Sequence, residues 1–504
     1  MPYPWNTLPQ PVIESLLTGS TGYAHLTRIA LAALTADKPQ PGLGLALLAE
    51  AWAHDPLNAT VASQLLALND KLHMLPGPLV PLLQQASKAQ IKLEALHSEL
   101  VRARDKASAN GILTLASQVE PFFPTAARML QAEGHFLAGR FERAGEACAA
   151  AAAPLAWLTN LRAECALRMG DREQAMTLYR DSLLAHPWQV NALLRLHDLD
   201  SGLDQAVDVP TGEKAILLYS WNKAEDLDRT LASLAASDTA GAHIIALDNG
   251  STDTTPLVLD AWANRLGKRF TKIRLPSNIG APAARNWLMT LPEVRRSDWT
   301  AYLDDDITLP HDWLGRLGAA ATAYPDAGVW GCKVVDMAQP AIIQNADLHL
   351  REPHEDSILT QTSVHPTLFE VTDLHHQGPD LGQFDYIRPC ASVTGCCHLF
   401  RTDRLLQAGE FDIRFSPTQF DDLEHDLRLL LVGHTPVYTG HLTVRHARLS
   451  GARCVTSNAA SGNAFGNNLK LQYKIGPDDT GRLRALADRA LSDDVLAKEQ
   501  ALGL

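Results

Sequence analysis

The feature that most constrains this chain is an alternation of apolar and amphipathic segments that begins near Lys214. KAILLYS is an apolar run of strand length, AEDLDRTLASLAA has its apolar residues at helical spacing, and HIIALDNGS is a second apolar run that ends in turn residues. Strands that alternate with crossover helices form a parallel sheet, in which ligands bind beyond the carboxyl ends of the strands. The sequence therefore predicts an α/β domain whose functional residues end the apolar runs.

The part of the chain before this domain has a different pattern. Residues 23–199 form alanine- and leucine-rich helical segments separated by short turns, without β-branched runs. Residues 164–187 contain two helices around a turn at Gly170, and an earlier segment repeats this pattern with Gly139 and Ala144. These segments resemble tetratricopeptide repeats, in which small residues let paired helices pack closely. Such a domain would bind a protein or peptide, or serve as a helical support; the residues leave both open.

Length, charge and cysteine content exclude several classes of protein. A chain of 504 residues exceeds one compact core, so we expect several domains. Its 57 acidic and 44 basic residues give a formal charge of -13, which argues against nucleic acid as the main partner. We see no secretory signal and no apolar stretch of the roughly 20 residues that span a membrane, so we expect a cytoplasmic protein without an integral membrane segment. Seven irregularly spaced cysteines suit reduced thiols.

Three consecutive carboxylates end a further apolar run in the segment WTAYLDDDITLP. Asp304, Asp305 and Asp306 would repel one another and would be costly to bury without a cation. Because alternate residues of an extended chain point to opposite sides, Asp304 and Asp306 should face one way and Asp305 another. The run therefore predicts a site for a divalent metal, Mn²⁺ or Mg²⁺, with a solvated acidic turn as the alternative.

Other polar residues follow the neighbouring apolar runs. Trp221 comes after the first run and Asp248 ends the second, so a ring and a carboxylate could together hold a nucleobase or ribose. The segment DNGSTD is also typical of a turn and helix start. Arg285, in SNIGAPAARN, could reach a phosphate from a helix start, or it could be an ordinary surface arginine. The histidines between Ala338 and Arg388 have no zinc-binding spacing.

The order of four segments, YSWNKAEDL, LDNGSTD, SNIGAPAARN and YLDDDITLPHDWL, resembles the family-2 nucleotide-diphospho-sugar glycosyltransferases with the GT-A fold. The later segments VTGCCHLFRTDRLLQAGEFDIRF and FDDLEHDLRLLLVGH extend the resemblance, which covers residues 214–476. It implies a Rossmann-like, mostly parallel sheet. We therefore expect a tetratricopeptide-like helical-repeat domain over residues 1–205, a linker over 206–213, the GT-A domain over 214–480 and a helical tail over 481–504.

Carried over position by position, the resemblance implies a set of nucleotide-binding residues and two metal ligands. The nucleotide-binding set is Trp221, Asn222, Asp248, Arg285, Asp304 and Asp305. Trp221 would stack on the base, and Asp248 would bind the base or ribose. Asp306, which completes a DXD motif, and His446 would bind the metal, with His441 as the alternative histidine.

The acidic segment that begins at Asp421 matches the family motif that supplies the catalytic base. The resemblance assigns this role to Asp422, with Asp421 as the alternative and helix capping as the structural explanation of the run. The base would take a proton from an acceptor hydroxyl on a glycan or protein during one inverting displacement from a donor such as a UDP-sugar. A non-catalytic scaffold that binds a partner through its helical repeats is the competing function. The sequence leaves a homo-oligomer open.

Overall fold

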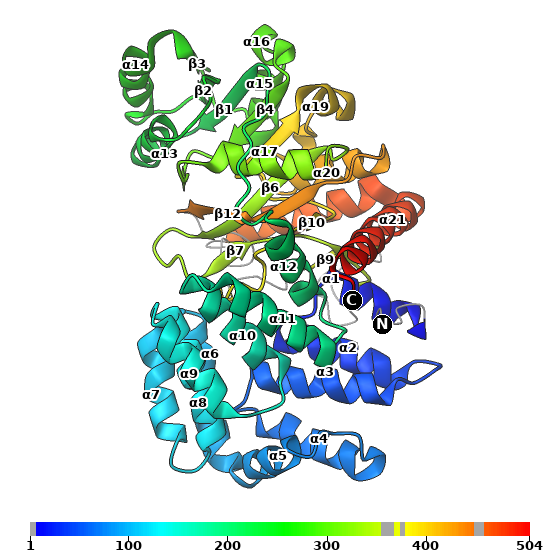
Figure 1. The fold of residues 1–504 in the computed structure, drawn as a ribbon. Helices are drawn as coiled ribbons and strands as arrows, with labels where there is room; N and C mark the ends of the chain where they lie inside the picture. The colour runs from blue at the N-terminus through cyan, green and yellow to red at the C-terminus, as the bar shows by residue number, and fades with distance from the viewer. Residues whose placement is uncertain (1–6, 354–366, 373–377, 448–457) are drawn as a thin grey trace. The chain divides into compact units, whose positions relative to one another are not determined.

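The computed structural model describes residues 7–353, 367–372, 378–447 and 458–504, with side chains in the last range from residue 462 onward. The chain forms two compact units (Figure 1). Unit 1 comprises Met1–Ser201, Gln377–Phe384 and Val495–Leu504, and unit 2 comprises Gly202–His376 and Asp385–Asp494. Among the histidines considered for zinc binding, His354, His365, His375 and His376 lie outside the described residues.

Unit 1 is helical, as the sequence predicts. Its helices are α1 (Gln10–Thr18), α2 (Tyr23–Thr35), α3 (Pro41–His54), α4 (Ala59–Leu72), α5 (Leu79–Lys88), α6 (Gln90–Arg104), α7 (Ala109–Val119), α8 (Pro124–Leu137), α9 (Phe141–Ala151), α10 (Ala156–Arg168), α11 (Arg172–Ala185) and α12 (Val190–Ser201). Gly170 turns the chain between α10 and α11 with a φ of 87°, a conformation that favours glycine. Ala144 and Ala175 are fully buried in α9 and α11, where a larger side chain would separate the helices. A helical-repeat domain fits this arrangement, and its tetratricopeptide class stays a prediction.

Unit 2 is an α/β unit. Its strands are β1 (Lys214–Ser220), β2 (His243–Asp248), β3 (Phe270–Arg274), β4 (Trp299–Leu303), β5 (Ile307–Thr308), β6 (Val329–Asp336), β7 (Ile343–Asn345), β8 (Leu350–Arg351), β9 (Glu370–Val371), β10 (Ile387–Pro389), β11 (Cys397–Arg401) and β12 (Val437–His446). Its helices are α13 (Ala224–Ala236), α14 (Thr255–Leu266), α15 (Ala281–Met289), α16 (Pro292–Arg296), α17 (Trp313–Ala323), α19 (Thr402–Ala408), α20 (Asp421–Leu431) and the part of α21 (Asn458–Leu502) that precedes Val495. Two short 3₁₀ turns, η2 (Gly267–Arg269) and η3 (Ile413–Phe415), complete it.

The main sheet of unit 2 has the strand order β10-β12-β6-β11-β4-β1-β2-β3. Parallel pairing joins β1 to β2 and β4, β2 to β3, and β6 to β12. Strand β11 is antiparallel to both β4 and β6, so β6 and β12 run in the same direction as β1 and β4. This mostly parallel mixed sheet and the helical unit before it confirm the predicted fold class. The carboxyl ends of β1, β2, β4, β6 and β12 therefore meet at one edge of the sheet.

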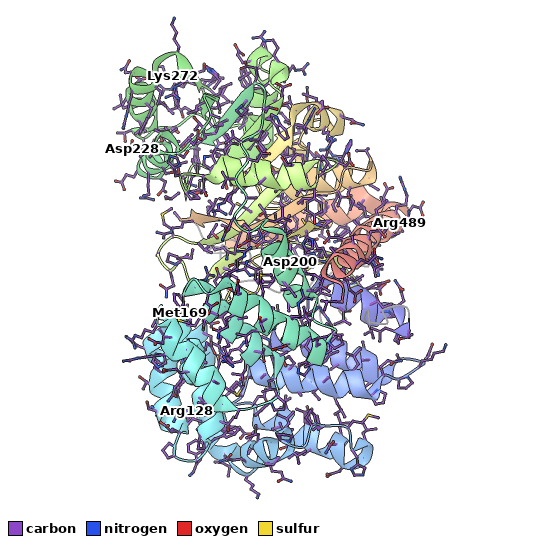
Figure 2. The ribbon with its side chains drawn as sticks, in the orientation of Figure 1. Arg128, Met169, Asp200, Asp228, Lys272 and Arg489 are labelled. Carbon is purple, nitrogen blue, oxygen red and sulfur yellow. The ribbon has the colours of Figure 1, made fainter. Side chains whose placement is uncertain are left out.

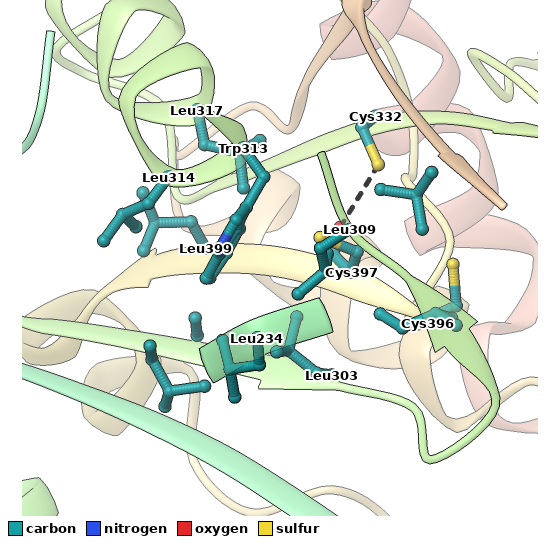
Figure 3. Close-up of a cluster of buried hydrophobic side chains, with 14 of the residues drawn as sticks. Leu234, Leu303, Leu309, Trp313, Leu314, Leu317, Cys332, Cys396, Cys397 and Leu399 are labelled. Carbon is teal, nitrogen blue, oxygen red and sulfur yellow. Dashed lines mark hydrogen bonds between the residues drawn. The ribbon is translucent and has the colours of Figure 1, made fainter. Parts of the chain in front are cut away.

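Apolar side chains from the sheet and its helices form the core of unit 2 (Figure 3). Trp313, Leu314 and Leu317 of α17 are buried there beside Leu399 of β11. The thiol of Cys332 contacts the carbonyl oxygen of Cys397 at 3.8 Å, and both residues are buried. The six cysteines that the structure describes all have free thiols, in agreement with the irregular spacing in the sequence.

Helix α13 illustrates why these segments fold as they do. Leu227, Leu231 and Leu234 recur at helical spacing and are buried in the core. Glu225 and Asp226 lie in the first turn, where negative charge is favourable. At the edge of the sheet, Lys272 of β3 is exposed (Figure 2), and a charge on an edge strand disfavours pairing with another chain.

The segment expected to be a linker, residues 206–213, has no regular secondary structure and packs along α17. The backbone N–H of Asp208 donates to the carbonyl of Gly315 at 2.9 Å, and its carboxylate accepts a hydrogen bond from Thr322. A Cβ atom at Gly318 would lie 1.9 Å from the carbonyl oxygen of Asp208, so this approach requires glycine. The segment therefore has a fixed place in unit 2.

The C-terminal helix α21 changes direction at Gly476, which has a φ of 69° and precedes Pro477. Leu471 and Ile475 before the kink and Leu483 after it share one apolar cluster with Leu427 of α20. The boundary expected at residue 480 thus falls inside the second half of a helix that packs in unit 2. None of the helices in the described ranges is long and apolar enough to cross a membrane.

Two buried histidines lie in an aromatic cluster beneath the carboxyl edge of the sheet. The ring of His425 stacks on Phe411 with centroids 4.3 Å apart, and His398 lies edge-on to Tyr302. Burial, together with the nearby charge of Arg428, lowers the pKa of His425 to about 3. The folded unit therefore holds this ring in its neutral form.

We predict that this burial makes the stability of unit 2 pH-dependent. The pKa of His425 is lower in the folded state than its ordinary value of 6.5. The unfolded chain therefore binds a proton more readily, so the free energy of unfolding is highest above pH 6.5 and decreases as pH falls toward 3. As pH falls from about 7 to about 5, this residue should lower the free energy of unfolding by about 2 kcal/mol. In urea unfolding, His425→Gln should show a weaker pH dependence than the wild type. The exposed His311, replaced in the same way, serves as the control, and equal pH dependence in all three proteins would contradict the prediction.

Candidate active site

The parallel strands bring the predicted site residues to one edge of the sheet. Ser220 at the end of β1 is in register with Asp248 at the end of β2, and Leu303 at the end of β4 directly precedes Asp304. His446 ends β12, which is bonded there to β5, the short strand that follows the acidic run. The loop before β11 enters at the same edge, where the N–H of Asp304 donates to the carbonyl of Cys396 at 2.9 Å.

Asp304, Asp306 and His446 form a cluster that could hold a metal ion. One side-chain donor atom from each lies within 4.8 Å of the other two. His446 Nε2 is 3.1 Å from Asp306 Oδ1 and 3.9 Å from Asp304 Oδ2. Two carboxylate oxygens and one imidazole nitrogen are ligands that suit Mn²⁺, and the oxygens suit Mg²⁺. The alternative histidine, His441, is not in the cluster found among the described residues.

The charges in this cluster affect its two carboxylates in opposite ways. Burial raises the pKa of Asp304 to about 6, and the charge of Asp306 adds to the rise. Burial also acts to raise the pKa of Asp306, but the hydrogen bond and charge of His446 and the ammonium of Lys223 outweigh it, so this pKa lies below its ordinary value. A bound cation would favour the charged form of both carboxylates and so relieve the repulsion between them.

Lys223 is a site residue to which sequence reasoning assigned no role. Its ammonium donates to Asp305 Oδ1 at 2.9 Å and to Asp306 Oδ2 at 2.7 Å. The side chain is only about one-fifth exposed (19%), so these ion pairs are largely shielded from solvent. Its position just after β1 could have indicated this role, because the acidic run follows β4 at the same edge of the sheet. Asp305 is not in the cluster found among the described residues, but it lies in a turn with Asp306 and shares the ammonium of Lys223 with it.

Arg285 lies buried between the acidic run and the acidic segment of α20. Its guanidinium forms an ion pair with Asp421, and its Nη2 is 4.0 Å from Asp304 Oδ1. The rings of Tyr219 and Phe411 flank it at 5.6 and 5.4 Å from their centroids. In this position Arg285 connects two groups of carboxylates that are far apart in sequence. The alternative of an ordinary surface arginine does not agree with its 4% exposure.

The two candidate bases on α20 have different surroundings. Asp421 is buried, and its carboxylate is engaged with Arg285. Asp422 is partly exposed, and its Oδ2 accepts a hydrogen bond from the N–H of Gly395 at 2.8 Å. Asp426, one turn further along, accepts from Ser392 and from the N–H of Val393, so the loop before β11 is attached to α20 at two points.

The residues predicted to bind the nucleotide occupy the ends of β1 and β2. Asp248 is buried, and its Oδ1 accepts from the N–H of Ser251 at 2.8 Å. Among the described residues no group hydrogen-bonds its Oδ2, although Arg274 Nε lies 3.3 Å away. Trp221 is 50% exposed, which leaves its ring available for stacking.

Asn222 has a structural function that the sequence did not indicate. Its φ of 52° is in the left-handed region, which asparagine tolerates better than most residues. Its side-chain oxygen accepts hydrogen bonds from the N–H groups of Thr252 and Asp253, at 2.7 and 3.3 Å. Because this oxygen holds the loop after β2, Asn222 stabilises the carboxyl edge of the sheet through the backbone.

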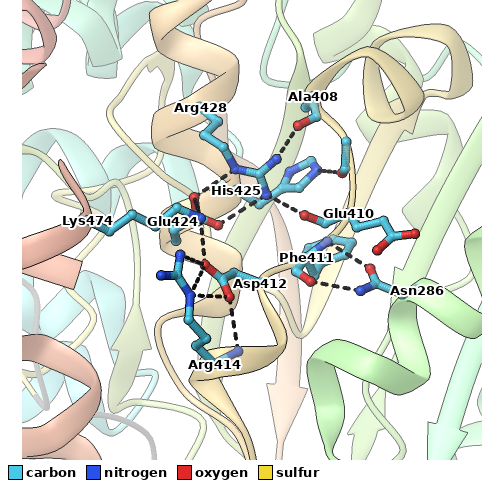
Figure 4. A network of polar contacts seen from close by, with 11 residues as sticks. Asn286, Ala408, Glu410, Phe411, Asp412, Arg414, Glu424, His425, Arg428 and Lys474 are labelled. Carbon is cyan, nitrogen blue, oxygen red and sulfur yellow. Dashed lines mark hydrogen bonds and ion pairs between the residues drawn. The ribbon is translucent and has the colours of Figure 1, made fainter. Parts of the chain in front are cut away.

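A polar network holds α20 against α21 (Figure 4). Lys474 of α21 forms ion pairs of 2.7 Å with both Asp412 and Glu424, and Glu424 also pairs with Arg428 at 2.7 Å. Glu424 is buried, so its charge is compensated from two sides. Lys474 therefore supports the helix that carries Asp421 and Asp422.

We predict that Gly395→Ala disrupts the site. An added Cβ would lie 2.7 Å from Arg285 Nη2 and 2.9 Å from Asp422 Oδ2, closer than packed atoms allow. Overpacking of this kind should lower the free energy of unfolding by about 1–3 kcal/mol, measured by urea denaturation. Gly466→Ala is the control, since a Cβ there meets no atom within 4 Å among the described residues. Unchanged stability of Gly395→Ala would show that the guanidinium and carboxylate can move apart freely.

We also predict that Lys223→Met destabilises the metal-free protein. Removal of the ammonium takes the lysine partner from Asp305 and leaves Asp306 with His446, and breaking a buried ion pair from one side costs about 3 kcal/mol or more. Mn²⁺ should then raise the melting temperature of the variant more than that of the wild type, because the cation compensates the same carboxylates. Thermal melts with and without Mn²⁺ measure both effects, and identical Mn²⁺-induced shifts would contradict this account.

The chain is similar to known proteins over part of its length. Residues 215–376 match the family model of glycosyl transferase family 2. The structure is similar to GalNAc-T7 with UDP, GalNAc and Mn²⁺ (12% identity, TM-score 0.41, 54% of this chain and 50% of that chain). It is also similar to the mannosyltransferase PcManGT from Pyrobaculum calidifontis in complex with GDP-Man and Mn²⁺ (13% identity, TM-score 0.38, 62% and 87%) and to S. aureus TarS (14% identity, TM-score 0.33, 47% and 36%).

The matches cover only part of each protein. The chain spans about half the length of GalNAc-T7. No curated protein matches the chain. The family model covers β1 to β9 of unit 2, which includes Asp248, Arg285 and the acidic run. The match to the glycosyl transferase family 2 model thus lies within unit 2 and covers less than half of the chain.

Proposed function

We propose that unit 2 transfers a sugar from a nucleotide-diphosphate donor to an acceptor hydroxyl, with inversion at the anomeric carbon. The observation that carries this proposal is the position of Arg285 between Asp304 of the acidic run and Asp421 of α20. A metal-binding cluster and a partly exposed carboxylate, Asp422, thereby flank one buried cation. A sugar-nucleotide reaction needs these two components, one for the diphosphate and one for the attacking hydroxyl.

The donor side of the site would use three features. The cluster of Asp304, Asp306 and His446 would hold Mn²⁺ or Mg²⁺, and the bound ion would offset the charge that develops on the departing diphosphate. The buried Oδ2 of Asp248 would accept a hydrogen bond from the base or a ribose hydroxyl, which would satisfy a polar atom otherwise left without one. The half-exposed ring of Trp221 would stack on the base.

On the acceptor side, we assign the base to Asp422. Its carboxylate would take the proton of the acceptor hydroxyl while the oxygen attacks the anomeric carbon and the bond to the diphosphate oxygen breaks. Asp421 is less suited, because Arg285 engages its carboxylate and burial keeps it from the acceptor. The N–H of Gly395 would hold the Asp422 carboxylate in place during the transfer.

The helical unit is proposed to recruit the acceptor. Its successive helix pairs, α8 with α9 and α10 with α11, are of the kind that stacks into an extended surface able to bind a protein or peptide. An acceptor carried on a protein would thus gain affinity from contacts remote from the transferred sugar.

The proposal predicts different defects in two variants. Asp306→Ala should remove metal-dependent donor binding, because it deletes a proposed metal ligand. Asp422→Ala should bind the donor with nearly wild-type affinity but lose turnover by roughly 10²–10⁴-fold, the usual contribution of a general base. Asp260→Ala, at an exposed carboxylate on α14, is the control for removal of a charge.

A panel of nucleotide sugars, tested by thermal shift with and without Mn²⁺, would measure donor binding, since a ligand that binds the folded state stabilises it by mass action. Donor hydrolysis and transfer would be measured on the same proteins. A wild-type protein that neither binds nor hydrolyses any donor would contradict the enzymatic function. Normal turnover of Asp422→Ala would contradict only the assignment of the base.

A further inference from the structure

Gln344, a residue of β7 with no assigned role, lies directly behind the candidate metal ligand His446. It is 1% exposed, and its Oε1 is 2.9 Å from His446 Nδ1. The opposite ring nitrogen, Nε2, is the one that faces Asp304 and Asp306. Gln344 therefore contacts the side of the imidazole that is turned away from the carboxylates.

The other contacts of Gln344 determine which way its amide faces. Its Nε2 donates to Asp336 Oδ2 at 3.1 Å and to the carbonyl oxygen of His446 at 3.2 Å. A carboxylate and a backbone carbonyl are acceptors, so the NH₂ group must lie on that side. The oxygen of the amide then faces His446 Nδ1, which must carry a proton to donate to it. Nε2 is then the ring nitrogen that faces Asp304 and Asp306: in the metal-free protein it can donate to Asp306 Oδ1, 3.1 Å away, and without that proton its lone pair is available to a cation.

The backbone holds this set of contacts in place. Val334 and Val335 of β6 pair with Asn345 and Ile343 of β7, so Gln344 lies at an irregularity in the strand pairing. Such bulges often redirect a side chain next to a functional site. Asp336 is in register with His446 across β6 and β12, and its Oδ1 accepts from the N–H of Gln339 at 2.7 Å. Both ends of the Asp336–Gln344–His446 chain are therefore anchored to strands.

We propose that Gln344 is a positioning residue for the metal site, because it holds His446 in the tautomer whose Nε2 can bind a divalent cation. The inference rests on the proposed function, since it assumes that His446 is a metal ligand there. Hydrogen bonds from outside the ligand shell commonly set the tautomer and orientation of a metal-binding histidine. A neutral amide performs this task without adding another negative charge beside Asp304 and Asp306.

The test replaces Gln344 with methionine, which keeps its length but removes both the acceptor and the donors. Gln344→Met should weaken Mn²⁺ binding to the full chain by roughly 10–100-fold in titration calorimetry, the range seen when such supporting residues are lost. Gln344→Asn is too short to reach Nδ1 and should weaken Mn²⁺ binding by the same factor. This variant tests the role of Gln344 if the methionine variant fails to fold. Gln472→Met, at another buried glutamine of unit 2 that bonds to Phe369 instead, is the matched control and should bind Mn²⁺ like the wild type.

A second measurement reports the tautomer itself. In metal-free protein labelled with ¹⁵N-histidine, at a pH that leaves one proton on the His446 ring, the fraction of molecules with that proton on Nδ1 should be larger in the wild type than in Gln344→Met, where Asp306 still accepts from Nε2 but the amide oxygen beside Nδ1 is gone. His446→Asn assigns the signal. If the wild type binds neither Mn²⁺ nor Mg²⁺, the metal site and the proposed function fail together with this inference. If the wild type binds metal and both Gln344 variants bind it equally well with an unchanged tautomer, the role of Gln344 alone is overturned.

Discussion

The site depends on the contacts that the buried guanidinium of Arg285 makes with two carboxylates. This guanidinium faces Asp421 on α20 and Asp304 after β4, and the rings of Tyr219 and Phe411 enclose it. An arginine at this depth would be costly without its carboxylates, and the carboxylates would be costly without it. The pair thus connects the end of the parallel sheet to the helix that carries the candidate base. Because the partners are mutually required, Asp304 and α20 are held together by this arginine.

The remaining negative charge at this edge is compensated locally. Lys223 forms ion pairs with Asp305 and Asp306. The ring of His446 lies close to the carboxylates of Asp306 and Asp304. On the far side of α20, Lys474 compensates Glu424. Lys223 follows β1, His446 ends β12 and Lys474 lies on α21, so each of these carboxylates is compensated by an element other than its own. Asp304, Asp306 and His446 lie close enough to one another to hold a metal ion.

The sequence predicted which strand ends share one edge of the sheet. Apolar runs that end in Asp248 and at the acidic run predict a common edge, because parallel strands place their carboxyl ends together. Alternation along an extended chain does not account for the acidic run, because Asp305 and Asp306 lie in a turn and share the ammonium of Lys223. Asn222 and Gln344 were beyond such reasoning: Asn222 holds a loop backbone, and Gln344 reaches His446 through a bulge in strand pairing.

By itself the sequence determined the two kinds of fold and the residue types of the site, because periodicity and strand-end chemistry are local properties of the chain. Only the tertiary structure determined which charged side chains form ion pairs with one another. Arg285 and Asp421 are 136 residues apart, and Lys223 and Asp306 are 83 apart. Pairs at such separations depend on strand order and helix packing, which no local pattern encodes. The structure likewise made Asp421 a partner of arginine and left Asp422 accessible, although the two are adjacent in sequence and chemically identical.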